Sequence, residues 1–289
     1  MSRRVLITGA TGALGRVVTS RLREKSRGFI VFTPGRGNAD DSLDLLDRDQ
    51  IRRAIECTCP NLVLHLAATF SNDFDEAYAV NVAAPRHLLE AVEACGRRVR
   101  VVLVGSAAEY GAVAPDDNPI GEDHVLRPVS VYGITKAWQT ELAYLHASRG
   151  SDVVVARIFN LVGPHLSERL FVGRLHKQID EIRRGNRTQI EVGQLSAIRD
   201  YLSIDDAVSQ FLTVADFGEA GRVYHVASGR PVTMRELLVR ELAAHGLDES
   251  IVVEGAALSN RSGYDVPAIY ADVTQTTALL EKRKNHVKY

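Results

Sequence analysis

Through its first half, the chain alternates short apolar runs with longer segments of helical spacing. The apolar runs are residues 5–7, 29–32, 62–64, 99–104 and 153–155. They are almost continuously hydrophobic, which is typical of strands buried on both faces of a parallel sheet. The helical segments between them are residues 12–26, 47–57, 73–95 and 131–149. This alternation predicts an α/β fold with a doubly wound parallel sheet covered by helices on both faces.

After about residue 160 the elements become shorter and less regular. They are a helix at 167–184, a strand at 190–192, a helix at 204–215, a strand at 223–226 and a helix at 233–245. We interpret residues 1–160 as one domain and 161–289 as mainly a smaller, partly interleaved lobe, with elements at about 190–226 returning to the sheet. The charged tail at 281–286 is expected to be frayed.

Composition and charge exclude several classes of protein. Of the 289 residues, 45% are apolar and 25% charged, as in ordinary globular proteins. The 35 basic and 36 acidic side chains give a net charge of −1, so no overall field would gather nucleic acid or anionic lipid. Gly9 comes before any leader-like apolar stretch, and no run approaches the ~18 residues of a membrane span, so we expect a soluble, cytoplasmic protein. Cys57, Cys59 and Cys95 lack the paired spacing of a zinc site, so no metal is expected.

A glycine-rich turn follows the first predicted strand and opens the first helix. Its spacing is Gly-x-x-Gly-x-x-Gly over Gly9 to Gly15. The general dinucleotide-binding fingerprint is Gly-x-Gly-x-x-Gly, which differs in the spacing of the first two glycines. Such a turn lets backbone N–H groups and a helix N-terminus approach a pyrophosphate, whereas the alternative is a tight strand-to-helix turn without a ligand. We therefore predict a Rossmann-type, dinucleotide-binding domain over residues 1–160. The expected contacts in the turn are Gly9, Thr11, Gly12, Ala13, Leu14 and Gly15.

The end of the second predicted strand bears on the choice of cofactor. Residues 32–36 carry no acid that would bind the ribose of NAD, whereas Arg36 and Arg16 would each pair with a 2′-phosphate. The alternative is that both arginines are solvated surface residues. We expect NADPH to be preferred, with NAD possible. Asp44 would accept a hydrogen bond from the adenine amino group, or instead cap a helix or form a turn.

Three residues predict the chemistry. Ser106 ends the fourth strand, and Tyr132 and Lys136 lie four residues apart on one face of the following helix. At the carboxyl edge of the sheet, a neighbouring ammonium would lower the phenol pKa from about 10 toward neutrality, an effect worth about 4 kcal/mol. Tyr132 would then donate or accept a proton, Ser106 would hold the carbonyl oxygen and Lys136 would also bind the nicotinamide ribose.

These motifs closely resemble the extended short-chain dehydrogenase/reductase family, in its nucleotide-sugar-modifying branch. The resemblance covers roughly residues 3–272. It includes the glycine turn, Asp44-Leu45, residues 65–68, Asn81-Val82, residues 104–111, Tyr132 to Lys136, residues 157–160, Gly163-Pro164 and Arg199-Asp200. It implies that Ser106, Tyr132 and Lys136 are catalytic, that Asn81 braces the sheet and that 161–289 is the substrate-binding lobe. The further cofactor contacts that it implies are Leu45, Leu66, Ala67, Ala68 and Asn81.

The resemblance also implies residues that hold a nucleotide-diphosphate sugar. A buried diphosphate needs at least one guanidinium fork, so arginines are the expected partners. The implied substrate contacts are Thr69, Ser106, Asn160, Arg174, Arg199 and Arg261. After Ala271-Asp272 the chain lacks the Gly-Trp-like segment of many relatives, which leaves the terminal substrate contacts open.

The residues after Ser106 indicate which reaction to expect. Dehydrating relatives have carboxylates at the next two positions, where this chain has Ala107 and Ala108, and Glu109 would point away from an extended segment. The chain looks most like 4-ketoreductases of GDP- or dTDP-linked 4-keto-6-deoxyhexoses, with NADPH as reductant. The alternatives are an NAD-dependent nucleotide-sugar 4-epimerase and, from another class, a dinucleotide-binding regulator without catalysis.

A homodimer is a further expectation from the resemblance. Relatives pair through the helix that carries the tyrosine and lysine. Trp138, Leu142 and Leu145 would form that seam, or they would cover the sheet instead.

Overall fold

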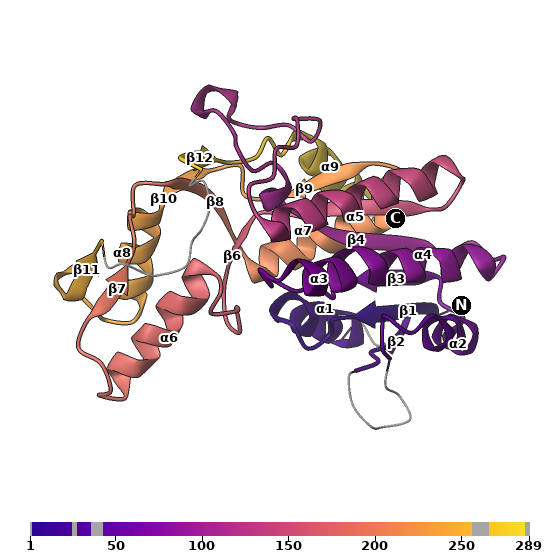
Figure 1. Cartoon of the computed structure of the whole chain (residues 1–289), viewed down its shortest axis with the longest axis horizontal. Helices are drawn as coiled ribbons and strands as arrows, with labels where there is room; N and C mark the ends of the chain where they lie inside the picture. The colour runs from indigo at the N-terminus through magenta and orange to yellow at the C-terminus, as the bar shows by residue number, and fades with distance from the viewer. Residues whose placement is uncertain (1, 25–27, 36–42, 256–265, 287–289) are drawn as a thin grey trace.

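A computed structural model describes residues 2–24, 28–35, 43–255 and 266–286 (Figure 1). Six parallel strands form the main sheet in the order β2-β1-β3-β4-β5-β9. They are β1 (Arg3–Thr8), β2 (Phe29–Phe32), β3 (Leu62–His65), β4 (Arg100–Ser106), β5 (Val153–Ile158) and β9 (Val223–Val226). Every residue of β3, β5 and β9 is buried, which confirms the predicted doubly wound parallel sheet.

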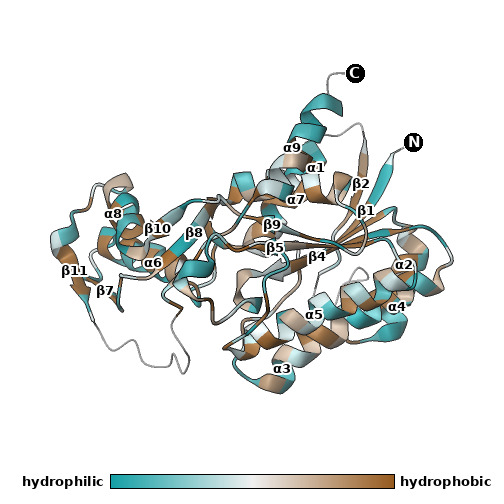
Figure 2. Ribbon diagram, turned by 90° about the horizontal axis from the view of Figure 1, so that it is seen from above, coloured by the Kyte–Doolittle hydropathy of each residue, from teal (hydrophilic) through white to brown (hydrophobic). Residues whose placement is uncertain are grey.

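Helices cover both faces of this sheet (Figure 2). One layer holds α1 (Ala13–Glu24), α7 (Ile204–Phe217) and α9 (Thr274–His286). The other layer holds α2 (Arg48–Thr58), α3 (Phe74–Tyr78), α4 (Ala84–Ala94) and α5 (Val131–Ser148). Separate apolar clusters fill the space under each layer, as the continuous hydrophobic runs of the strands require.

Two segments differ from the expectation. The helix expected over 73–95 is divided into α3, a π-helical turn (Ala79–Ala83) and α4, because Pro85 lacks the N–H that a continuous helix would use there. The tail expected to fray is helical through His286 in α9. Arg283 Nη1 secures it by donating to Ser209 O at 3.0 Å and to Thr213 Oγ1 at 2.8 Å in α7.

The smaller lobe is built from short strands and two helices. Its strands are β6 (Asn160–Val162), β7 (Ile190–Val192), β8 (Ile198–Ser203), β10 (Pro231–Thr233), β11 (Val252–Glu254) and β12 (Ala268–Ile269), and its helices are α6 (Phe171–Arg183) and α8 (Met234–Ala244). Strand β8 pairs with β6, β10 and β12, whereas β7 pairs with β11. Between 190 and 226, α7 and β9 return to the main sheet. The proposed domain boundary at residue 160 stays a prediction.

Short 3₁₀ turns complete the chain at Ala107–Glu109, Pro115–Asp117 and Glu249–Ile251. Within the described ranges, no helix combines the length and the apolar character that crossing a membrane requires.

Candidate active site

The glycine turn between β1 and α1 leaves no room for side chains at two positions. Gly9 has φ +71°, and a Cβ there would lie 2.5 Å from the amide nitrogen of Ala67. At Gly15 a Cβ would lie 2.2 Å from the carbonyl oxygen of Gly9. Thr11 and Gly12 are exposed at the tip of the turn, while Arg16 Nε donates to Thr11 O at 2.8 Å. The turn is therefore a tightly folded glycine cradle beside the carboxyl end of β3, and its backbone is exposed at Thr11 and Gly12.

A groove runs along α1 from this turn. Its cavity of about 550 Å³ is lined by Ala10, Arg16, Thr19, Ser20, Arg23 and Glu24. Arg23 Nη2 donates to Thr33 Oγ1 at 3.1 Å, which brings its guanidinium to the end of β2. The buried Thr19 hydroxyl has no hydrogen-bond partner within the described part of the chain. The arginines Arg16 and Arg23 thus border one groove.

Of two residues proposed to bind the adenosine end of the cofactor, Asp44 is described by the structure and Arg36 is not. Arg36 lies outside the described residues. Asp44 Oδ1 accepts from the backbone N–H of Leu46 at 2.9 Å, so it forms a turn before α2, which Asp47 caps. Leu45 lies within that turn.

Asn81 of the π-helical turn hydrogen-bonds the segment that follows β3. Asn81 is fully buried, and its Oδ1 accepts from Thr69 N at 3.0 Å. Its Nδ2 donates to Thr69 O and to Thr135 Oγ1 in α5, both at 3.0 Å. Because both of its N–H groups are used within the protein, Asn81 ties the loop after β3 to the helix that carries Tyr132. Leu66, Ala67 and Ala68 lie in that loop.

Ser106 and Tyr132 meet at the carboxyl edge of the sheet. Ser106 ends β4, and its Oγ accepts from Ala108 N at 3.2 Å. Ser130 caps α5 by accepting from Gly133 N at 3.0 Å, so Tyr132 lies in the first turn. The Tyr132 phenol forms a hydrogen bond with Ser106, and the ring of Phe70 packs against the Tyr132 ring with centroids 4.7 Å apart.

The predicted direction of the Tyr132 pKa is wrong in this structure. Burial outweighs the Ser106 hydrogen bond and raises the pKa of Tyr132 to about 12. The buried ammonium of Lys136 instead donates to Gln139 Oε1 at 2.7 Å, one turn further along α5. Burial lowers the pKa of Lys136 to about 8, and the charge of Glu109 opposes that fall.

The carboxylate of Glu109 is a site feature that sequence reasoning missed. The segment after Ser106 is a 3₁₀ turn rather than an extended strand, so Glu109 folds beneath Ser106 and is fully buried. Its Oε1 accepts from Ser106 N at 2.6 Å, and its Oε2 pairs with Arg157 Nη2 at 2.8 Å. An arginine inside the otherwise apolar β5 was the signal that a buried acid must lie opposite.

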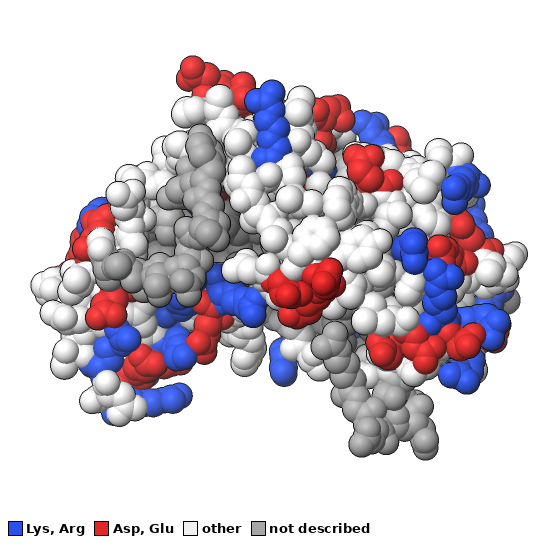
Figure 3. All heavy atoms as spheres, viewed as in Figure 1, with Lys and Arg blue, Asp and Glu red and all other residues white. Residues whose placement is uncertain are grey.

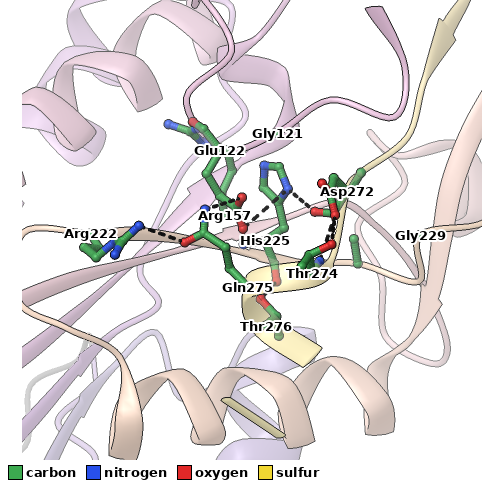
Figure 4. A network of polar contacts seen from close by, with 12 residues as sticks. Gly121, Glu122, Arg157, Arg222, His225, Gly229, Asp272, Thr274, Gln275 and Thr276 are labelled. Atoms are coloured by element: carbon green, nitrogen blue, oxygen red, sulfur yellow. Dashed lines mark hydrogen bonds and ion pairs between the residues drawn. The ribbon is translucent and has the colours of Figure 1, made fainter. Parts of the chain in front are cut away.

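Arg157 belongs to a network that reaches the C-terminal helix (Figure 4). Its Nη1 donates to the carbonyl oxygen of Glu122 at 3.2 Å, and Glu122 Oε1 accepts from His225 N at 3.2 Å. His225 Nδ1 donates to the carbonyl oxygen of Asp272 at 2.8 Å, and burial lowers the pKa of this histidine to about 4. Gln275 of α9 donates to Glu122 Oε2 at 2.9 Å. The network therefore joins the site to α9.

The described residues that were proposed to bind substrate contact neighbouring segments of the chain. Asn160 Nδ2 donates to Asp200 O at 3.1 Å, and the half-buried Arg199 lies next along β8, the strand paired with β6. Thr69 Oγ1 donates to Glu76 Oε1 at 3.1 Å. Arg174 Nη1 donates to Arg169 O at 2.9 Å within its own segment. Arg261 lies outside the described residues.

On the face shown in Figure 3, acidic and basic side chains are intermingled rather than gathered by sign. Among the described residues, no group of three or more His, Cys, Asp and Glu side chains is placed to hold a metal ion.

A parallel sheet with a glycine cradle at its carboxyl edge, facing a serine and a tyrosine, defines a Rossmann-type dehydrogenase/reductase site. A sequence model described as "NAD dependent epimerase/dehydratase family" matches residues 5–227. The chain belongs to this family, an extended short-chain dehydrogenase/reductase family, which confirms the prediction made from the motifs.

Individual relatives have different activities. The chain is 27% identical over 285 residues to a GDP-6-deoxy-D-mannose reductase of Pseudomonas aeruginosa, covering 96% of this chain and 91% of the relative. It is 30% identical over 294 residues to a UDP-glucose 4-epimerase of Streptomyces lividans, covering 94% of this chain and 84% of the relative. The solved structure of RMD from Pseudomonas aeruginosa, complexed with NADPH, shares the fold with a TM-score of 0.83 and 24% identity, over 96% of this chain and 92% of that one.

Proposed function

We propose that the chain is an NADPH-dependent reductase of the C4 ketone of a nucleotide-diphosphate 4-keto-6-deoxyhexose, linked to GDP or dTDP. The observation that carries the proposal is the contact between Ser106 and Tyr132 at the carboxyl edge of the sheet, together with alanines at the two positions after Ser106, Ala107 and Ala108. Two alanines offer no acid or base for eliminating a hydroxyl group. The similarity to a GDP-6-deoxy-D-mannose reductase over 96% of the chain supports the same reaction.

The glycine cradle fits a dinucleotide, because Gly9 and Gly15 let the turn pack tightly on the chain's own backbone while Gly12 at its tip is exposed and open to a pyrophosphate. The groove along α1 fits the 2′-phosphate that distinguishes NADPH, because the guanidinium groups of Arg16 and Arg23 border it. Bound there, NADPH would supply a hydride to the ketone. We expect NAD to bind more weakly. Lys136 would hold the nicotinamide ribose.

Tyr132 would supply the proton that completes the reduction. With its pKa raised to about 12, the phenol is fully protonated at neutral pH and can act as a donor. The Ser106 hydroxyl would hold the carbonyl oxygen and then stabilise the phenolate, because its hydrogen bond lowers the pKa of Tyr132. The proposal assigns the sugar and its diphosphate to Thr69, Asn160, Arg174, Arg199 and Arg261.

A 4-epimerase is the second candidate, because the chain is 30% identical to one over 94% of its length. An epimerase regenerates its cofactor in each turnover, whereas a reductase consumes one NADPH per product. The test incubates the chain with NADPH and, separately, GDP-, dTDP- and UDP-linked 4-keto-6-deoxyhexoses while absorbance of the reduced cofactor is followed. Stoichiometric loss with one sugar supports the reductase. Because a ketone carbon has no configuration to invert, the epimerase is tested separately with NAD and the same nucleotides linked to C4-hydroxy hexoses. Interconversion at C4 without net change in the cofactor supports the epimerase, and no conversion of either set of sugars supports the non-catalytic regulator.

We also propose that the enzyme is a homodimer that pairs through α3 and α5. Trp138 and Leu145 are 42% and 44% exposed, so they do not cover the sheet, whereas Leu142 packs on the core. The rings of Phe74 and Tyr78 meet the Trp138 ring edge-on, with centroids 5.9 and 6.1 Å away. A contiguous aromatic surface of this kind is typical of a contact with another chain.

A further inference from the structure

The carboxylate of Glu109 contacts three elements of the main sheet domain. Its Oε1 accepts from the backbone N–H of Ser106 at 2.6 Å, at the end of β4. Its Oε2 accepts from Thr140 Oγ1 in α5 at 2.8 Å, and from Arg157 in β5 at 2.8 Å through Nη2 and 3.1 Å through Nε. Gly105 leaves room for this carboxylate, because a side chain there would place its Cβ only 2.7 Å from Glu109 Oε1. One side chain thus joins the strand of Ser106 to the helix of Tyr132.

These contacts determine how two reacting groups face each other. Ser106 sits on a strand end and Tyr132 on the first turn of a helix, so their separation depends on how α5 lies against β4. Thr140 is one turn beyond Lys136 on the same helix, and Glu109 is its hydrogen-bond partner. Gln139 makes the neighbouring link, with Nε2 donating to Val104 O at 2.9 Å.

We propose that Glu109 is a positioning residue that fixes α5 against the end of β4, so that Ser106 and Tyr132 face the same carbonyl oxygen. The proposal rests on the proposed reductase function. Glu109 does not act on the sugar itself, because it is 0% exposed and its oxygens are taken by Ser106, Thr140 and Arg157.

The charge of Glu109 gives a second effect, which a purely structural residue would not have. It raises the pKa of Lys136 and of Tyr132. The other groups near Lys136 are Gln139, which is neutral, and His65, whose pKa is lowered to about 3 by burial and by the lysine charge. Removing the Glu109 charge should therefore lower the pKa of Lys136 below about 8.

Two substitutions separate position from charge. Thr140→Val removes the tether to α5 and keeps the carboxylate, so kcat should fall about tenfold while the KM for NADPH and the pH dependence stay unchanged. Glu109→Gln removes the charge, so kcat should fall and the alkaline limb of its pH profile should move to lower pH. The matched control is Thr213→Val, an equally buried threonine in α7 that contacts Arg283 and not the site.

Readouts that need no substrate keep this test separate from the proposed function. NMR titration of the free protein should show a lower Lys136 pKa in Glu109→Gln, with Lys136 assigned from Lys136→Met. Because Glu109→Gln leaves Arg157 buried without a counter-ion, it can fail to fold, and Thr140→Val then decides. A crystal structure of Thr140→Val should show the hydrogen bond between Ser106 and Tyr132 lost.

The inference is overturned if folded Thr140→Val keeps that hydrogen bond and, where a ketosugar is reduced, the kcat of the control. It is equally overturned if the Lys136 titration of folded Glu109→Gln matches that of the unsubstituted protein. A chain that reduces no ketosugar refutes the reductase, while the titration and the crystal structure still judge Glu109.

Discussion

Lys136 Nζ donates to Gln139 Oε1 over 2.7 Å, and this contact keeps the ammonium on its own helix. Gln139 donates in turn to the carbonyl oxygen of Val104, two residues before Ser106. The ammonium is thus anchored beside the site and almost fully shielded from water. Its pKa of about 8 follows from that burial, and it makes the charge of Lys136 sensitive to mildly alkaline pH.

The reduction rate should therefore decline as pH rises through about 8. The sign follows from the two titrations: reduction needs Tyr132 protonated and Lys136 charged, and Lys136 loses its proton first because the pKa of Tyr132 is about 12. The measurement is kcat/KM for the accepted ketosugar between neutral and strongly alkaline pH, because this ratio reports the titration of the free enzyme. A rate that stays constant until the phenol itself titrates would show that the Lys136 charge is dispensable.

Replacing the proton donor should separate chemistry from binding. Tyr132→Phe removes the phenolic oxygen while the ring keeps its packing on Phe70, 4.7 Å away between centroids. We expect ketosugar reduction to fall by about 10²–10⁴-fold, the usual contribution of a general acid. NADPH binding, followed by fluorescence of the reduced cofactor, should be retained. Turnover near the level of the unsubstituted chain would remove Tyr132 from this role.

The groove along α1 predicts how cofactor preference is set. Arg16→Ala and Arg23→Ala should each weaken NADPH more than NADH, because each removes a guanidinium that borders the groove. Arg36→Ala is expected to do the same on sequence grounds. Dissociation constants for both cofactors are measured by fluorescence titration. Arg21→Ala is the matched control, because Arg21 lies on the same helix but pairs with Asp205 at 2.8 Å. Equal losses for NADPH and NADH would contradict a 2′-phosphate site here.

Two buried histidines predict that stability falls in mild acid. Burial lowers the pKa of His65 to about 3 and that of His225 to about 4, from an ordinary value of 6.5. The unfolded chain therefore binds more protons below pH 6.5, so the free energy of unfolding should drop by about 1.4 kcal/mol per pH unit for each histidine. Urea unfolding at pH 6.5 and at about pH 5 measures this slope.

His65→Gln provides the comparison for that slope. It removes one of the two titrations, so the loss of stability between these pH values should be about half as steep. The residue lies at the end of β3, where its Nδ1 and Thr8 Oγ1 are 2.9 Å apart. An unchanged slope would mean that His65 is charged in the folded protein.

Local patterns were enough to predict the sheet and the helix that carries Tyr132 and Lys136. Continuous apolar runs identify buried strands, and the spacing of Tyr132 and Lys136 already places both on one helix face. The break between α3 and α4 was visible in the sequence only as Pro85. The hydrogen bond from Asn81, in the π-helical turn at this break, to Thr69 O was not visible there. Glu109 was assigned the wrong environment because the turn after Ser106 is set by contacts with Arg157 and Thr140, which are 48 and 31 residues away in sequence.

The direction of the Tyr132 pKa could not be predicted from spacing either. An ammonium four residues along a helix was expected to act on the phenol, yet Lys136 instead contacts Gln139, three residues further on. The balance between burial and hydrogen bonding is a property of packing, which the sequence does not display. The sequence also left two positions possible for Trp138, because an apolar residue on a helix can pack on the sheet or lie on the exposed face of the helix.

Trp138→Glu should convert a dimer to a monomer. The Trp138 ring is 42% exposed and packs edge-on against Phe74 and Tyr78, which are 45% and 39% exposed, so a second copy seated on this surface would cover all three rings. On association, a carboxylate at this position would lose its hydration, which costs several kcal/mol. That cost exceeds the binding free energy that a peripheral contact of the interface contributes. Sedimentation velocity of both proteins gives the mass. Val239→Glu in α8, at a site that is 39% exposed on the lobe, is the control and should leave the mass unchanged. A monomeric unsubstituted chain, or a dimeric Trp138→Glu, would show that the aromatic surface serves another purpose.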